Sequence, residues 1–262
     1  MVKFDFKNKV VLVLASSKGI GFELAKEFAK NNARVIICSR SLKNLNLAKK
    51  KIKSFKIEKK IKFLKTDLSI YKNISLLHKE ARKSFNTDID ILINNSGGPA
   101  PKMTIDTNKN DWDYVLNNNL KSFIFMSLKV LPGMKKKKWG RIVNLTSTTA
   151  KEPAEKMVLS NVSRAAVVAF SKTLSKEIKI NGITINSILT GGVLTDRLIQ
   201  LIKKSNTNVN SVLKNIAKSI PVQHIAKPSE FVNLILFLCT DEASYINGTA
   251  IQVDGGVTKT IF

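Results

Sequence analysis

Residues Leu14-Ala15-Ser16-Ser17-Lys18-Gly19-Ile20-Gly21 decide how this chain folds. They follow the apolar run Val10–Leu14, which predicts a buried strand, and they lead into Ile20–Lys30, where apolar residues recur at helical spacing. A strand, a turn of small residues and a helix in this order let backbone N–H groups at the helix N-terminus approach a phosphate closely. The segment therefore predicts a diphosphate-binding loop. The alternative is a tight turn whose glycines serve backbone geometry only.

The alternation of short apolar runs and helical periods continues to the C-terminus. The predicted strands are Val10–Leu14, Arg34–Cys38, Ile61–Leu64, Ile89–Ile93, Arg141–Leu145, Ile183–Ile188 and Ala250–Val253. Helices are predicted at Ile20–Lys30, Leu42–Phe55, Ile70–Phe85, Trp112–Leu131, Leu159–Ile180 and Glu230–Leu238. Because the strands are apolar throughout, helices are expected to cover both faces of the sheet. We predict one doubly wound α/β (Rossmann) domain over residues 1–262, with a seven-stranded parallel sheet. The irregular stretch Leu189–Lys227 is the candidate substrate lid.

The composition is that of a globular chain. Of 262 residues, 44% are apolar and 24% are charged, which excludes fibrous and disordered classes. Cys38 and Cys239 lie in separate apolar segments, which argues against a disulfide framework or a zinc site and for a reducing compartment. No apolar run approaches the ~18 residues that span a bilayer. We therefore predict a cytoplasmic protein with neither a metal centre nor a membrane segment.

The charge is strongly basic, with 44 Lys and Arg against 19 Asp and Glu and a formal net charge of +25. Most of the excess is Lys, spread over predicted helix faces such as residues 49–60 and over Lys135–Lys138 rather than clustered. This pattern favours a solvated basic surface and no specific nucleic-acid partner, so nucleic-acid binding is the weakest interpretation. A further interpretation is steering of acidic partners, such as a phosphorylated cofactor or an acidic carrier protein.

The end of the second predicted strand selects the coenzyme. A dinucleotide site that prefers a free ribose 2′-hydroxyl carries an acidic residue about 20 residues beyond its glycine-rich loop. This chain has Ser39-Arg40-Ser41 there instead, and Lys18 lies in the loop itself. Two cations at the expected 2′-phosphate position favour NADP(H). Alternatively, both cations belong to the general basic excess.

Further motifs follow the later strands in the same order. They are Asp67-Leu68, Asn94-Asn95-Ser96-Gly97, Asn119 after Trp112, Ser147, Gly191–Thr195, Tyr245–Gly248 and Val253–Gly256. On these residues and the loop Lys18–Gly21, the chain resembles the short-chain dehydrogenase/reductase family over essentially its whole length. Within that family it is most similar to the 3-oxoacyl-carrier-protein reductase-like branch.

The resemblance implies an NADP-dependent oxidoreductase that interconverts a ketone and a secondary alcohol. The implied substrate is a small-molecule or acyl-carrier carbonyl compound, and the implied assembly is a homo-oligomer, either a tetramer or a dimer. Asn119 and Ser147 match catalytic positions, and Asp67 matches an adenine contact. The implied coenzyme contacts are Ser16, Ser17, Lys18, Gly19, Ile20, Gly21, Ser39, Arg40, Asp67, Leu68, Asn94, Ser96, Gly97, Arg164, Gly192, Val193 and Thr195.

The chain departs from the family pattern at three places. Ala15 stands for the first glycine of the phosphate loop, and Thr190 stands for the proline of a Pro-Gly pair. Counting from Ser147 at the family's spacing, Ser160 occupies the catalytic tyrosine position and Arg164 the lysine position. Both still share one helix face, because they are four residues apart.

The third departure changes the chemistry. A phenol can be tuned to donate a proton, whereas an aliphatic hydroxyl is far less acidic, and a guanidinium stays charged and relays no proton. The proton could come from water held by Ser147, Asn119 and Ser160, or from the substrate. We therefore expect an oxidoreductase with a non-standard active site, and the alternative is a catalytically weak or inactive nucleotide-binding sensor or scaffold. Glu155 and His224 are weaker proton carriers, better explained as surface residues.

Overall fold

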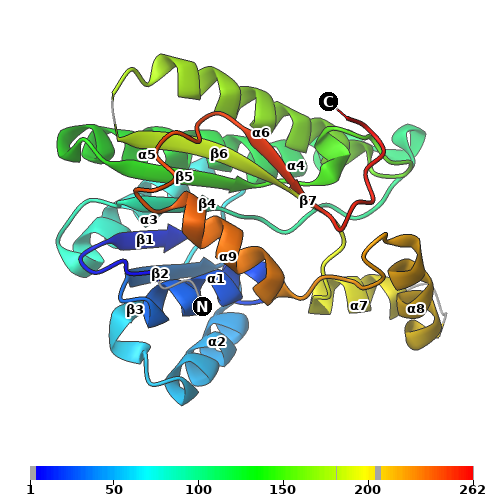
Figure 1. Ribbon diagram of the computed structural model, residues 1–262, viewed down its shortest axis with the longest axis horizontal. Coiled ribbons are helices and arrows are strands. Elements are labelled where there is room, and N and C mark those ends of the chain that lie inside the picture. Colours follow the sequence, from blue (N-terminus) through cyan, green and yellow to red (C-terminus); the bar gives the residue numbers. More distant parts are fainter. Residues whose placement is uncertain (1–3, 181, 204–207, 262) are drawn as a thin grey trace.

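The predicted strands form one parallel sheet in the computed structural model, which describes residues 4–180, 182–203 and 208–261. Within these ranges the sheet has seven strands in the order β3-β2-β1-β4-β5-β6-β7 (Figure 1). The prediction is confirmed for every strand, with ends displaced by no more than two residues. The strands are β1 Val10–Val13, β2 Arg34–Ser39, β3 Ile61–Lys65, β4 Ile91–Asn94, β5 Gly140–Leu145, β6 Ile183–Thr190 and β7 Ala250–Val253.

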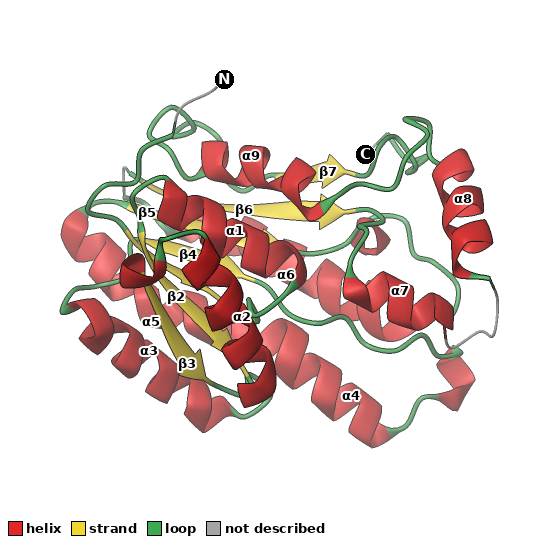
Figure 2. Ribbon diagram, turned by 90° about the horizontal axis from the view of Figure 1, so that it is seen from below, coloured by secondary structure: helices red, strands yellow, loops and turns green. Residues whose placement is uncertain are grey.

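Helices cover both faces of the sheet, as the uniformly apolar strands predict. Val11 and Val13 belong to a core shared with α1 (Gly19–Lys30) and α9 (Pro228–Leu238). The alternate residues Val10 and Leu12 face a second core on the opposite side. Figure 2 shows α1, α2 and α9 in front of the sheet and α3 and α5 behind it. The doubly wound α/β fold is thereby confirmed.

The remaining helices lie between successive strands or in the excursion before β7. They are α2 Leu42–Ser54, α3 Tyr71–Phe85, α4 Lys109–Val115, α5 Ser122–Lys137, α6 Val158–Glu177, α7 Asp196–Lys203 and α8 Val209–Ser219. Short 3-10 turns occur at Glu58–Lys60, Thr104–Asp106 and Thr148–Ala150. In the described part of the chain, no helix combines the length and hydrophobicity needed to cross a membrane.

The prediction of a single regular helix over Trp112–Leu131 is wrong in one respect. A π-helical stretch, Leu116–Lys121, separates α4 from α5. Its sequence contains Asn117-Asn118-Asn119, and asparagine side chains compete with the backbone for hydrogen bonds, which weakens a regular helix. Stretches of π-helix are frequent at functional sites. This one holds the predicted catalytic residue Asn119.

The predicted lid, Leu189–Lys227, is more regular than expected, although residues 204–207 lie outside the described ranges. It contains α7 and α8, which lie beyond the ends to which the strand arrows point (Figure 1). Its two ends are joined to each other, because Leu194 N donates to Ala226 O at 2.8 Å. The excursion is therefore a hairpin of helices set over the carboxyl edge of the sheet.

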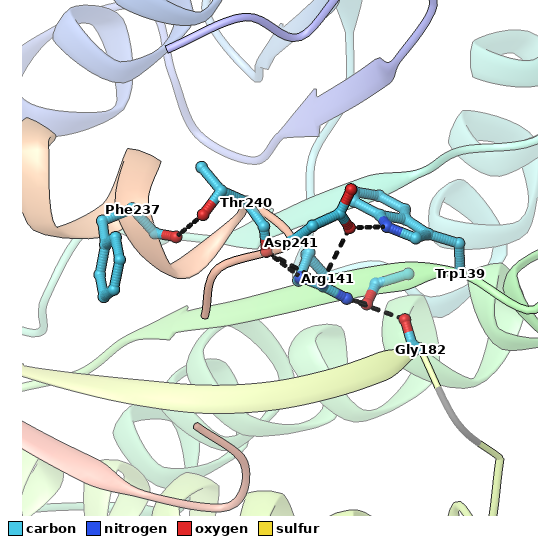
Figure 3. Close-up of polar contacts among 7 residues, drawn as sticks. Trp139, Arg141, Gly182, Phe237, Thr240 and Asp241 are labelled. Carbon is cyan, nitrogen blue, oxygen red and sulfur yellow. Dashed lines mark hydrogen bonds and ion pairs between the residues drawn. The ribbon is translucent and has the colours of Figure 1, made fainter. Parts of the chain in front are cut away.

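Arg141 holds the opposite edge of the sheet together (Figure 3). Its side chain is 1% exposed although it is charged. Two guanidinium nitrogens donate to Thr240 O just beyond α9, at 3.0 and 2.9 Å, and a third donates to Gly182 O before β6 at 2.8 Å. Asp241 supplies a charge at 3.4 Å, and the Trp139 ring lies 4.6 Å away. Arg141 thus links the start of β5 to the start of β6 and to the residues after α9, at the edge of the sheet opposite the carboxyl ends of the strands.

Candidate functional site

The carboxyl ends of the strands border a cavity of about 580 Å³, a typical size for a small-molecule site. Loops that follow β1, β2, β3, β4, β5 and β6 all contribute to its wall. The strand order reverses between β1 and β4, and doubly wound sheets bind ligands at such a reversal. The predicted site residues that line this one cavity are Ser17, Lys18, Gly19, Ile20, Ser39, Arg40, Asp67, Leu68, Ser96, Gly97, Ser147, Ser160, Arg164, Val193 and Thr195.

The loop after β1 has the shape that a phosphate-binding turn needs. Gly19 adopts a φ of +62°, a conformation that favours glycine, and it is the first residue of α1. At Gly21, a Cβ would lie 2.9 Å from Ser16 Cα and 2.7 Å from Asn95 Nδ2. The helix therefore packs tightly on the loop, and the N-terminal amides of α1 point into the cavity region where a diphosphate would lie.

Ala15 enters the same loop with a φ of +44°. Left-handed backbone is unfavourable for residues that carry a Cβ. In the sequence, Ala15 stands at a position where the family's loop has a glycine. The loop thus holds a left-handed backbone at Ala15 although this residue carries a Cβ.

The cationic end of the cavity lies at the carboxyl end of β2. Ser17 Oγ donates to Ser39 Oγ at 3.1 Å, so the loops after β1 and β2 are tied together. Arg40 Nη1 donates to the hydroxyl of Tyr114 at 2.7 Å, which fixes an otherwise exposed guanidinium at the cavity. Lys18 lines the same wall. These groups form a basic, hydroxyl-rich recess without a carboxylate at the end of β2, as a 2′-phosphate requires.

Ser147 and Ser160 line the other end of the cavity, and the hydroxyl of Thr149 lies within reach of both. Ser147 Oγ accepts hydrogen bonds from the N–H of Thr149 at 3.2 Å and from its hydroxyl at 3.1 Å. Thr149 Oγ1 also lies 3.4 Å from Ser160 Oγ. Because Ser147 accepts from both groups, its own proton is free to point into the cavity. Ser147, Thr149 and Ser160 are called the hydroxyl cluster below.

Arg164 lies beside this cluster and is 5% exposed. Its guanidinium donates to Leu145 O at 3.1 Å and to Ser96 O at 3.4 Å, and no carboxylate in the described residues pairs with it. Burial, together with the nearby charge of Arg197, lowers the pKa of Arg164 to about 10. The group is still charged at neutral pH. It places an uncompensated positive charge next to the point where a substrate oxygen would meet the hydroxyl cluster.

Five of the predicted residues do not line the cavity, namely Ser16, Gly21, Asn94, Asn119 and Gly192. Ser16 is buried, donates to Val13 O at 2.6 Å and accepts from Cys38 N at 3.3 Å. It therefore joins the ends of β1 and β2. Gly21 acts through its close approach to the loop, and Gly192 is exposed with no atom near its Cβ position.

Asn94 and Asn119 support the cavity wall from behind. Asn94 is fully buried and donates to Asn144 Oδ1 at 2.7 Å, within the sheet. Asn119, also fully buried, donates to Gly97 O at 3.3 Å and accepts from Asn118 at 2.7 Å. The π-helical stretch thus aims the Asn119 amide at the loop after β4. Its structural role is to position Gly97, which does line the cavity.

The sequence analysis missed three residues of the site. Thr149 was detectable in principle, since it lies two residues beyond Ser147 on the same loop. Tyr114 and Arg197 were not, because each reaches the cavity by a contact between distant segments: Tyr114 with Arg40, and Arg197 with Pro99. The weaker candidates are both exposed; His224 pairs with Glu230 at 2.7 Å, which raises the pKa of His224, away from the cavity.

Known proteins share this architecture. The family profile described as enoyl-(acyl carrier protein) reductase matches residues 14–258. The chain is 29% identical over 251 residues to the 3-oxoacyl-[acyl-carrier-protein] reductase FabG of Haemophilus influenzae, covering 96% of this chain and 98% of that protein. It is 32% identical over 255 residues to the oxidoreductase UcpA of Salmonella typhimurium, covering 96% of this chain and 95% of that protein. The crystal structure of L-sorbose reductase from Gluconobacter frateurii with NADPH and L-sorbose matches with a TM-score of 0.93 at 28% identity, over 99% of this chain and all of that one. The matches and the cavity at the reversal of strand order together show that this chain belongs to the short-chain dehydrogenase/reductase family of NAD(P)H-dependent oxidoreductases.

Proposed function

We propose that this protein is an NADP(H)-dependent reductase that interconverts a ketone and a secondary alcohol through a non-standard active site. One observation carries the proposal: the phosphate loop, the basic recess at the end of β2, and Ser147 and Ser160 with Arg164 all border one cavity. The 3-oxoacyl-carrier-protein reductases among the relatives favour an acyl-carrier or other small carbonyl substrate. The similar sorbose reductase was crystallised in complex with NADPH, which favours the phosphorylated coenzyme.

The residues present fit a dinucleotide with a 2′-phosphate. The α1 N-terminus would hold the diphosphate, and the tight approach at Gly21 leaves the backbone close to it. Lys18 and Arg40 would hold the 2′-phosphate, and Val193 and Thr195 would lie against the nicotinamide. When bound, the coenzyme supplies or accepts the hydride at the substrate carbon.

The chain's own residues act on the substrate oxygen. Ser147 donates its free proton in a hydrogen bond to the carbonyl, and Ser160 borders the same position. As hydride adds to the carbon, negative charge develops on the oxygen, and the buried cation Arg164 stabilises that charge. One proton must then reach that oxygen. The hydroxyl cluster conducts it from water, since no phenol belongs to the cluster and Tyr114 is bound by Arg40.

Activity with matched coenzymes tests the proposal. Purified protein is incubated with NADPH or NADH and a panel of ketones that includes ketoses and 3-oxoacyl thioesters, while the absorbance of the reduced nicotinamide is followed. We expect oxidation of NADPH with at least one ketone, slower oxidation of NADH, and a loss of about a hundredfold in kcat for Ser147→Ala. Tight NADPH binding without turnover on any ketone contradicts the reductase proposal.

That negative result favours the second candidate, a nucleotide-binding sensor or scaffold. Ser160 in place of a phenol motivates it, because a serine hydroxyl is a poor proton donor. The double variant Ser160→Tyr with Arg164→Lys separates the two. A large gain in rate indicates a decayed enzyme, and a loss indicates that the native pair is functional. A homo-oligomeric assembly and a substrate-lid role for Leu189–Lys227 are further parts of the proposal.

A further inference from the structure

The crevice at the reversal of strand order has two walls, one after β1 and one after β4. Gly19 belongs to the first wall and Gly97–Pro99 to the second. The start of α7 touches both. Thr195 Cγ2 lies 3.6 Å from the position that a Cβ on Gly19 would take. Two residues further, Arg197 Nη2 donates to Pro99 O at 2.8 Å. The segment Thr195–Arg197 therefore bridges the crevice above the α1 N-terminus.

Arg197 has guanidinium N–H groups available for a ligand at this place. Its guanidinium carries five N–H groups, of which Pro99 O takes one. No described carboxylate forms an ion pair with it, although Asp196 is its neighbour in sequence. Burial lowers the pKa of Arg197, and Arg164 is a second cation close by. Arg197 is a partly buried cation that lines a ligand cavity and has no counter-ion among the described residues. We therefore expect it to bind an anionic group of the ligand.

We propose that Arg197 is a clasp that closes over the diphosphate of the bound dinucleotide, with the α1 N-terminus holding it from the opposite side. The inference rests on the proposed function and adds a coenzyme-binding residue to it. The diphosphate is the anion of the dinucleotide that would lie between the two walls, next to Gly19 at the start of α1. The 2′-phosphate would lie at Arg40 beyond β2, and Tyr114, which binds Arg40 and lies near Arg197, stands between that recess and the crevice. Arg197 thus recognises what NADPH and NADH share, whereas Arg40 recognises what distinguishes them.

Calorimetric binding of three ligands to whole protein tests the clasp without any turnover. The ligands are NADPH, NADH and adenosine 2′-phosphate, which carries the 2′-phosphate but no diphosphate. For Arg197→Gln we expect the Kd of NADPH and of NADH to rise by the same factor, between about tenfold and a hundredfold, since a charge-assisted contact is lost. The Kd of adenosine 2′-phosphate should not change. Arg197→Lys keeps the positive charge but not the planar guanidinium with its several donors, so the Kd of both dinucleotides should rise by a smaller factor.

Arg34→Gln is the matched control. It removes the same charge from the first residue of β2, at the opposite edge of the sheet, and should leave all three Kd values unchanged. Equal weakening of adenosine 2′-phosphate by Arg197→Gln, or no weakening of the dinucleotides, overturns the clasp. An unchanged coenzyme Kd together with a raised KM for an anionic ketone also overturns it and assigns Arg197 to the substrate. If the wild-type protein binds neither dinucleotide, the proposed function itself fails, which is a distinct outcome.

Discussion

The loop after β1 holds the backbone of Ala15 in a strained conformation, so replacing Ala15 with glycine should stabilise the protein. The φ of Ala15, +44°, lies in the left-handed region. That conformation costs an L-residue roughly 1–2 kcal/mol, and glycine avoids the penalty. Glycine adds roughly 0.5–1 kcal/mol of backbone entropy to the unfolded chain. The Ala15 methyl also packs at the edge of the second core, so a small contact is lost. The balance predicts a gain of about 0.5–1 kcal/mol for Ala15→Gly.

Urea unfolding with an unchanged m-value measures that gain, and the melting temperature should rise by about 1–4 °C. Ala169→Gly is the control, because Ala169 is an exposed residue of α6 with no such strain. Glycine there should cost about 1 kcal/mol. Equal destabilisation by the two substitutions would refute the idea that the loop holds Ala15 in a strained backbone. A gain at position 15 alone supports it.

Three further predictions follow from single side chains. Tyr114→Phe frees Arg40, so the Kd of NADPH should rise several-fold while that of NADH stays constant in the same titration. Arg164→Met removes a buried charge that is fully present at pH 7, below its pKa of about 10, but it also takes the donors from Leu145 O and Ser96 O; the two effects oppose each other, so the free energy of unfolding in urea should change by less than about 1 kcal/mol while ketone reduction is lost. Arg141→Met leaves the carbonyl of Thr240 without its two guanidinium donors and removes one of the two donors to Gly182 O, the other being Gly140 N, so its urea midpoint should fall by about 2 kcal/mol equivalent, with the NADPH Kd of the folded protein unchanged.

The fold was predictable because its signals are local. Each strand is a short apolar run, and a run such as Ile91–Asn94, buried on both faces, has no other place than the middle of a covered sheet. The loop after β1 was predictable for the same reason, since Ser17–Gly21 are consecutive. The π-helical stretch was not, because the apolar period continues through it. The helices α7 and α8 were missed because their short amphipathic patterns compete with flanking loop residues.

The site residues also differ in whether local sequence signals could place them. Ser147, Ser160 and Arg164 could be placed by counting along the chain, and the cavity brings them together. Arg197 could not be placed, because its partner Pro99 is 98 residues away and only the packing of α7 over the crevice joins them. Sequence spacing finds groups on one element. It does not find contacts that close a crevice from opposite walls.

Ser160 and Arg164 lie on a different element from the groups that would hold the phosphates of the coenzyme. The groups that would hold the coenzyme's phosphates come from the loops after β1 and β2 and from the start of α7, whereas Ser160 and Arg164 both lie on α6. A change on α6 therefore alters proton supply and the field at the substrate oxygen without moving the phosphate-binding groups. We therefore expect substitutions on α6 to change turnover without changing coenzyme affinity. Binding must accordingly be measured apart from activity, because tight NADPH binding would support the crevice and say nothing about whether the hydroxyl cluster delivers a proton.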